Sequence, residues 1–174
     1  MPRPQANEYP QQMPPYMLQY VSLVEGDNIA TVISKYNDAH IHFIDALPQS
    51  KADYAYAENK WTVKEALQHI IDTERVFAYR ALCIARGETQ TLPGFDQNVY
   101  QEMSNAKHRP FDNLKEEFKA VRYANNILLQ SLDSEQILRI GNVADYKASV
   151  NAFAYTIYGH FIHHQNIFEE RYLQ

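Results

Sequence analysis

"NKWTVKEALQHIIDTERVFAYRALCIARGE", residues 59–88, is the stretch of the chain with the clearest helix signals. Thr62 and Glu65 stand three positions apart, which is the spacing of a capping box at the start of a helix. Apolar residues recur at helical spacing from there through Phe77, and Gly87 suits the left-handed position that follows many helix ends. The stretch therefore predicts one long amphipathic helix.

Three further segments show apolar residues at helical spacing between caps or prolines, and they cover residues 27–47, 112–131 and 149–172. Residues 88–111 connect the second helix to the third, and this connection is longer than most in compact domains. A long crossover permits neighbouring helices to run parallel. The sequence thus predicts an all-α four-helix bundle that departs from simple up-down-up-down topology.

The beginning of the chain differs in composition from the rest. Five of its eight prolines lie within the first fifteen residues, together with three glutamines. Such a segment buries too little apolar surface to pack alone, so we expect an extended arm over residues 1–20. Residues 21–174 show no internal repeat and no second change of composition, which predicts a single bundle domain.

Composition also narrows the partners and the compartment. The formal net charge is −5, and no run of Lys and Arg is concentrated enough to follow a phosphate backbone, so we expect no nucleic acid partner. We find neither the apolar core of a secretory signal nor a stretch of about 18 apolar residues, so we expect a cytoplasmic protein without membrane association. The single cysteine, Cys83, lies in an apolar run and is interpreted as a packing residue.

Near the end of the chain, "YGHFIHHQNIF", residues 158–168, places three histidines within five positions. With about 100° of rotation per residue, His160 and His164 lie on the apolar stripe that carries Phe153, whereas His163 lies roughly 60° to the other side of His160. Two imidazoles one turn apart can bind one metal ion together. The alternative is that both are core histidines that hydrogen-bond to protein groups.

His69 is the candidate for a third ligand, although it lies about 120° from the centre of the apolar arc of its helix, which suggests the rim of the bundle. Glu74 lies closer to that centre, so we expect it either to pair inside the bundle with an Arg or Tyr or to line a polar cavity. Glu74 and Asp72 are the catalytic candidates, as groups that orient a ligand or move protons. Asp72 follows His69 by three residues and could contact it.

These two stretches, with "LPGF" at residues 92–95 between them, closely resemble the DinB-like (YfiT-like) superfamily of metal-dependent proteins. The resemblance runs from about residue 16 to the end of the chain. It implies a four-helix bundle of up-down-down-up topology, with the long crossover between helices two and three, and a homodimer. It also implies a divalent metal ion held by His69, His160 and His164.

Three neutral imidazoles leave a coordination position open on an ion such as zinc or nickel, where a water or a thiol can become a nucleophile. We therefore expect a metal-dependent enzyme that acts on a small molecule, either as a transferase that uses a low-molecular-weight thiol or as a hydrolase. A zincin protease is disfavoured because Phe161 stands where its catalytic Glu would be, and a di-iron bundle because no histidine has a Glu three positions before it.

A protein without catalytic activity is the alternative. In that case the metal staples the bundle or reports metal availability, and a fourth protein ligand closes the site. His163, His108 and Glu74 are the candidates for that ligand.

Overall fold

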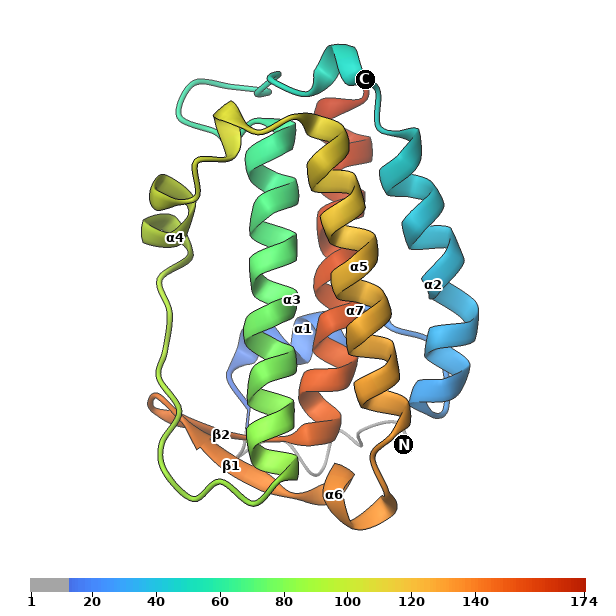
Figure 1. Ribbon diagram of the computed structural model, residues 1–174, viewed down its shortest axis with the longest axis vertical. Coiled ribbons are helices and arrows are strands. Elements are labelled where there is room, and N and C mark those ends of the chain that lie inside the picture. Colours follow the sequence, from blue (N-terminus) through green and yellow to red (C-terminus); the bar gives the residue numbers. More distant parts are fainter. Residues whose placement is uncertain (1–12) are drawn as a thin grey trace.

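Four long helices form the body of the protein in the computed structural model, which describes residues 13–174 (Figure 1). They are α2 (Ile29–Ala46), α3 (Val63–Ala85), α5 (Phe111–Gln130) and α7 (Val150–Ile167). Figure 1 shows that α2 and α7 run in one direction and α3 and α5 in the other. Helix α3 packs against α5 and α7, and α2 packs against the same two helices. The expected up-down-down-up bundle is thereby confirmed.

The helix ends follow the predicted signals closely. Thr62 and Glu65 form the capping box at the start of α3, and the Ser149 side chain accepts a hydrogen bond from the Ala152 amide at the start of α7. Gly87 adopts φ +87° just beyond α3, a conformation that costs a glycine little. The chain continues past α7 as one wider π-helical turn, Phe168–Tyr172.

The crossover between α3 and α5 runs along the full length of the bundle (Figure 1). These two neighbouring helices are therefore parallel. It contains the short helix α4 (Gln97–Met103) and the 3-10 turn η3 (Ala106–His108); a similar turn, η2 (Gln49–Lys51), follows α2. The Asp96 side chain caps α4 by accepting from the amides of Asn98 and Val99. None of these short elements was predicted from the sequence.

A small β-hairpin closes the lower end of the bundle, after the short helix α6 (Ser134–Leu138). Its strands are β1 (Ile140–Val143) and β2 (Tyr146–Ser149), which pair antiparallel. The crossover joins it, because the Leu92 amide donates to the Asn142 carbonyl and the Leu92 carbonyl accepts from the Ala144 amide, both at 2.9 Å. The hairpin thus fixes the start of the crossover to the start of α7.

An additional helix, α1 (Pro15–Leu23), lies against α7. The expectation of an extended arm is therefore wrong for residues 15–20. Met17, Val21 and Val24 recur at helical spacing and are buried against the bundle, and proline is well tolerated in the first turn of a helix. Residues 1–12 of the predicted arm lie outside the described residues.

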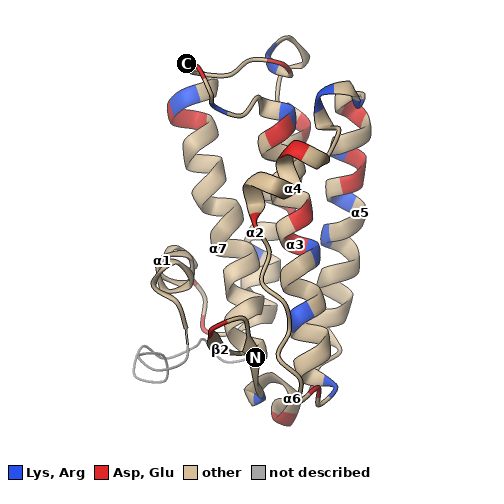
Figure 2. Ribbon diagram, turned by 90° about the vertical axis from the view of Figure 1, so that its left-hand side faces the viewer, with Lys and Arg blue, Asp and Glu red and all other residues tan. Residues whose placement is uncertain are grey.

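Helix α7 occupies the interior and carries no Lys, Arg, Asp or Glu between Val150 and Ile167. In Figure 2 this helix is tan up to its last turn, while charges of both signs gather on α3 and α5. Every residue of α7 from Val150 to Phe161 is buried. The imidazoles of α7 are thus polar groups on an otherwise uncharged helix.

No helix in the described part of the chain is long and apolar enough to cross a membrane.

Candidate metal centre

Three imidazoles converge between α3 and α7. The Nε2 atom of His160 lies 3.1 Å from Nε2 of His69 and 3.1 Å from Nε2 of His164. Ligand nitrogens at about 2.0–2.1 Å from a tetrahedral ion lie roughly 3.3 Å apart. The observed spacing therefore fits one ion held by these three side chains, which are the three predicted from the sequence.

The local structure explains why the rings meet. His160 and His164 are one turn apart on α7, and α3 packs directly against α7, so His69 faces them from the opposite side. The Thr73 hydroxyl lies 3.4 Å from Nδ1 of His69, a long hydrogen bond in which the hydroxyl can accept a proton carried by Nδ1. In that tautomer the lone pair of Nε2 is free for a metal, as in many histidine metal sites.

Burial keeps the three rings neutral. Desolvation, and then the nearby His163, lower the pKa of His69 to about 4. Desolvation, followed by the neighbouring imidazoles, holds the pKa values of His160 and His164 well below 6.5. Neutral imidazoles are the form that binds metal ions.

The cluster is poorly satisfied by protein groups alone. Nδ1 of His160 is buried without a hydrogen-bond partner, and its Nε2 lies within hydrogen-bond distance of the other two imidazoles. Hydrogen atoms cannot satisfy three converging ring nitrogens at once, whereas one cation accepts all three lone pairs. The chemistry of this donor set therefore fits a divalent ion such as zinc or nickel.

His163 remains outside the cluster, as its angular position predicted. It is half-buried, and its ring lies 5.3 Å from that of Tyr20 and 5.2 Å from that of His164. His108 lies in η3, at the other end of the crossover. Among residues 13–174, the only group of three or more His, Cys, Asp or Glu side chains close enough to share an ion consists of His69, His160 and His164. No fourth side chain of these four types joins the group in the described chain.

His69, expected at the rim of the bundle, is only 5% exposed, yet it lines a cavity beside the cluster. Trp61, just before α3, folds back so that its ring lies 4.9 Å from that of His69. A helical projection considers one helix alone and does not include other segments of the chain that pack against it. The ring of Trp61 therefore buries His69, which would otherwise be exposed at the edge of the bundle.

Glu74 is buried and accepts hydrogen bonds from Arg122 and Asn125, which confirms the expected pairing with an arginine inside the bundle. Asp72 accepts from Gln68 and lies 3.7 Å from Arg75. Nδ1 of His69 lies beside the Thr73 hydroxyl, not beside Asp72. The structure does not bring either acidic candidate to the cluster.

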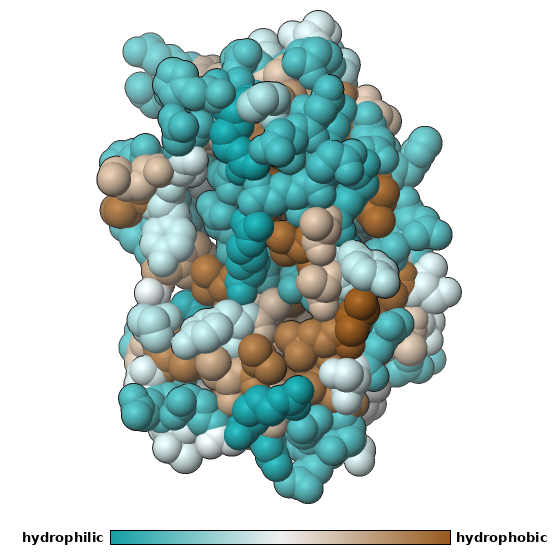
Figure 3. All heavy atoms as spheres, viewed as in Figure 1, coloured by the Kyte–Doolittle hydropathy of each residue, from teal (hydrophilic) through white to brown (hydrophobic). Residues whose placement is uncertain are grey.

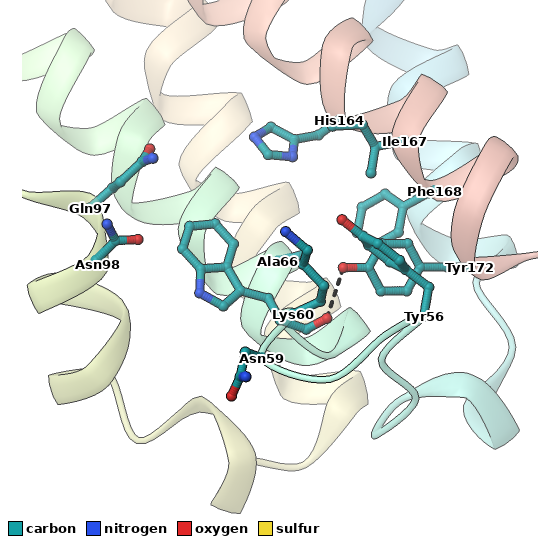
Figure 4. A pocket seen from close by; sticks show the side chains of 11 residues that line it. Tyr56, Asn59, Lys60, Ala66, Gln97, Asn98, His164, Ile167, Phe168 and Tyr172 are labelled. Atoms are coloured by element: carbon teal, nitrogen blue, oxygen red, sulfur yellow. Dashed lines mark hydrogen bonds between the residues drawn. The ribbon is translucent and has the colours of Figure 1, made fainter.

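Two cavities flank the imidazoles. The aromatic cavity, about 320 Å³, is lined by Tyr16, Tyr20, His69, Thr73, Phe77, Phe95, Gln97 and His160. The polar cavity, about 280 Å³, is lined by Tyr56, Asn59, Lys60, Trp61, Ala66, Gln97, Asn98, His164, Ile167, Phe168 and Tyr172. Figure 4 shows His164 on one side of the polar cavity and Gln97 and Asn98 across from it. The candidate site is thus open to small molecules from two sides, and Gln97 lines both.

The sequence profile of the DinB superfamily matches residues 37–168. The chain belongs to the DinB superfamily. All three histidines of the cluster lie within the matched region, and α1 lies before it. The resemblance noted in the sequence is thereby confirmed.

Solved structures agree with the DinB fold. YfiT from Bacillus subtilis, described as a probable metal-dependent hydrolase with an unusual four-helix bundle topology, aligns with a TM-score of 0.65 at 18% identity, over 76% of this chain and 83% of its own. YjoA, a DinB-like protein from the same organism, aligns with a TM-score of 0.58 at 17% identity, over 82% of this chain and 87% of its own. The chain has no match among curated proteins.

Several residues around the three-histidine cluster were not predicted from the sequence. Thr73 follows His69 by one helical turn, and this spacing was a usable signal for a partner of the ring. Trp61 precedes the capping box and gave no directional signal. Tyr20 and Gln97 come from α1 and the crossover, whose positions depend on tertiary contacts. Only the three-dimensional structure places these residues at the site.

Proposed function

We propose that this protein is a metal-dependent enzyme that activates a small nucleophile beside His69, His160 and His164. The observation that carries the proposal is the convergence of three neutral imidazoles, two of them buried and that of His164 half-buried, between two cavities. A zinc or nickel ion held there supplies an open coordination position and lowers the pKa of a water or thiol that occupies it. A stapling site would not need cavities on either side.

Thiol transfer is the first choice of reaction, because two separate cavities meet at the cluster. In such a reaction the thiol loses its proton, a sulfur–carbon bond forms, and the bond from that carbon to its leaving group breaks. With a haloarene the products are a thioether, a halide ion and a proton; with an epoxide the ring oxygen takes up the proton. The polar cavity, with Asn59, Lys60 and Asn98, suits the polar body of a low-molecular-weight thiol.

Hydrolysis of a small amide or ester is the second choice, and it is favoured by the fold shared with YfiT, a probable metal-dependent hydrolase. There, water adds to the carbonyl carbon, the bond to the leaving group breaks, and the leaving group takes up a proton. This reaction needs one organic substrate, so it leaves the second cavity without a role. The non-enzymatic alternative, a metal-stapled or metal-responsive bundle, needs neither cavity.

The experiment that tests the proposal combines metal loading with a substrate panel. The purified protein is stripped with chelator and reloaded with zinc or nickel. It is then assayed with common cellular thiols against a haloarene and an epoxide, and with small esters and amides. We expect a rate that requires metal and is lost in His160→Ala. Thiol-independent ester or amide cleavage would replace the first choice with the second, and absence of any metal-dependent rate would favour the stapled bundle.

A further inference from the structure

Helix α1 lies directly over the imidazole cluster. The Tyr20 ring lies 5.3 Å from the ring of His160, nearly perpendicular to it, and 5.3 Å from the ring of His163. Tyr16, one turn earlier, also lines the aromatic cavity. Figure 2 shows α1 crossing beside the middle of α7. The N-terminal helix, outside the region that matches the superfamily, therefore completes the site.

Gly159 allows this close approach. A Cβ atom at Gly159 would lie 1.9 Å from the carbonyl oxygen of Tyr20 and 2.4 Å from its carbonyl carbon. These are backbone atoms, so no side-chain rotation could relieve the clash. The glycine that precedes His160 thus positions the backbone of α1, and with it the ring of Tyr20, against the cluster.

Four aromatic rings form the walls of the aromatic cavity: Tyr16 and Tyr20 from α1, Phe77 from α3 and Phe95 from the crossover. Aromatic rings bind flat apolar molecules through buried area and through stacked or edge-on contacts. An apolar cavity of about 150 Å³ is known to hold benzene. The cavity of about 320 Å³ therefore has room for a substituted ring.

The buried side chain of Arg80 contacts two of these rings and is linked by hydrogen bonds to the segments that carry the others. Arg80 lies with its guanidinium carbon 5.9 Å from the ring centroid of Phe77 and 5.5 Å from that of Phe95. It donates to the Pro93 carbonyl at 2.8 Å and to the Tyr146 hydroxyl at 3.3 Å. The Tyr146 hydroxyl in turn lies 3.3 Å from that of Tyr16. This network joins α3, the crossover, the hairpin and α1, so the cavity is shaped before any ligand enters.

We propose that the aromatic cavity binds a small molecule with an aromatic ring, and that α1 forms the wall that selects it. The ring lies between Tyr20 and Phe77, and its reactive carbon faces His69 and His160. The catalytic meaning of this inference rests on the proposed function, in which the ring belongs to the electrophile and the polar cavity receives the nucleophile. The binding site itself rests on the geometry of α1, Gly159 and the four rings.

The test measures binding without catalysis. 4-Fluorobenzyl alcohol is titrated into chelator-treated protein and into zinc-loaded protein, and its ¹⁹F NMR signal reports the Kd. Tyr16→Ala and Tyr20→Ala are compared with Leu18→Ala and Leu23→Ala, which remove exposed side chains of the same helix that do not line the cavity. Loss of one aromatic contact of about 1 kcal/mol corresponds to a roughly fivefold weaker Kd.

We expect the probe to bind both forms of the wild-type protein, Tyr20→Ala to weaken it about fivefold or more, and the two controls to stay within twofold. Gly159→Ala should weaken it similarly by displacing α1, with circular dichroism as the check on folding. If Gly159→Ala does not fold, the tyrosine variants still decide. Equal affinity in wild type, Tyr16→Ala and Tyr20→Ala, or no binding to either form, would overturn the inference.

The outcomes also separate this inference from the proposed function. Probe binding that depends on Tyr20 in a protein without metal-dependent activity supports the pocket and removes the enzyme. Metal-dependent activity on an aromatic electrophile with an unchanged KM in Tyr16→Ala and Tyr20→Ala removes the pocket and keeps the enzyme.

Discussion

Arg122 donates from Nε to both carboxylate oxygens of Glu74, at 3.1 Å each, and the two side chains are 0% and 1% exposed. Breaking a buried ion pair by removing one partner typically costs about 3–5 kcal/mol, because the other charge remains buried. We therefore predict a loss of this size in the free energy of unfolding of Glu74→Ala, measured by urea denaturation. The metal content of the folded variant should not change, since Glu74 lies outside the cluster.

A matched control is Glu135→Ala, which removes a glutamate that is 80% exposed and paired with Arg139. Exposed pairs contribute about 0–1 kcal/mol, so this variant should be close to wild type. A cost for Glu74→Ala no larger than that of the control would mean that His40 and the surrounding rings already satisfy the charge of Arg122.

The elements predicted well from the sequence are those with strong local signals. The Thr62–Glu65 capping box and the Ser149 cap involve neighbours in the chain, so a pattern alone locates them. The i, i+4 pair of His160 and His164 is equally local. Its register on α7 followed from helical rotation without knowledge of the other helices.

The elements that were missed depend on contacts far along the chain. The hairpin turns at Ala144, which adopts φ 47° without being a glycine or an asparagine, so no turn signal marks it. Helix α1 is nine residues long, too short to be stable alone, and it depends on burial of Met17 and Val21 against the bundle. Its prolines suggested disorder, and the approach at Gly159 became visible only in three dimensions.

The protein should lose stability as the pH falls below about 6.5. Burial, and then the charge of Arg122, lower the pKa of His40 to about 2 from an ordinary value of 6.5. The unfolded chain binds a proton at this residue below pH 6.5 and the folded protein does not, so unfolding is favoured by about 1.4 kcal/mol per pH unit per such group. This destabilisation by His40 is absent above pH 6.5 and grows steadily as the pH falls below that value.

We predict that His40→Asn reduces this slope by about one proton in metal-free protein, measured by urea denaturation at pH values from 7.5 to 5. The amide oxygen of Asn can still accept from Arg122 but does not titrate. Stability at pH 7.5 is expected to fall because the ring of His40 stacks on Phe161 at 4.0 Å. The readout is the slope of the free energy of unfolding against pH, not its value at pH 7.5. An unchanged slope would contradict the neutral, buried state of His40.

Removal of metal should weaken the fold without abolishing it. The bundle already buries continuous apolar faces, while an ion adds bonds in the folded state only. At a free metal concentration 100 times Kd the ion contributes about 2.7 kcal/mol, which corresponds to roughly 5–10 °C in Tm for a chain of this size. Chelation should lower Tm by that amount and retain the helical circular dichroism at 25 °C. Loss of the helical signal at 25 °C would indicate a strictly structural metal.

The homodimer implied by the family resemblance remains a proposal, and the exposed faces of α3 and α5 give it a location. Tyr79, Leu82, Tyr123 and Ile127 are 36–69% exposed there, and Figure 3 shows apolar side chains gathered on this lower face. A contiguous exposed apolar area commonly marks an interface. We predict a mass of about twice 20.3 kDa by light scattering, and a monomer for Tyr123→Glu. The control Leu18→Glu lies on α1 and should leave the mass unchanged.

The three histidines of the cluster should be equivalent for metal binding, and His163 should not matter. Replacing His69, His160 or His164 by Ala leaves two imidazoles, too few for tight binding of zinc or nickel. His163→Ala is the matched control from the same helix turn, and it should retain the metal. Plasma emission on the four folded variants gives the metal content, and the single tryptophan, Trp61, gives a second readout because its ring lies 4.9 Å from that of His69. Nickel should alter its fluorescence in wild type and His163→Ala only. An empty site in His163→Ala, with a full one in His160→Ala, would show that the register of α7 differs from the one described.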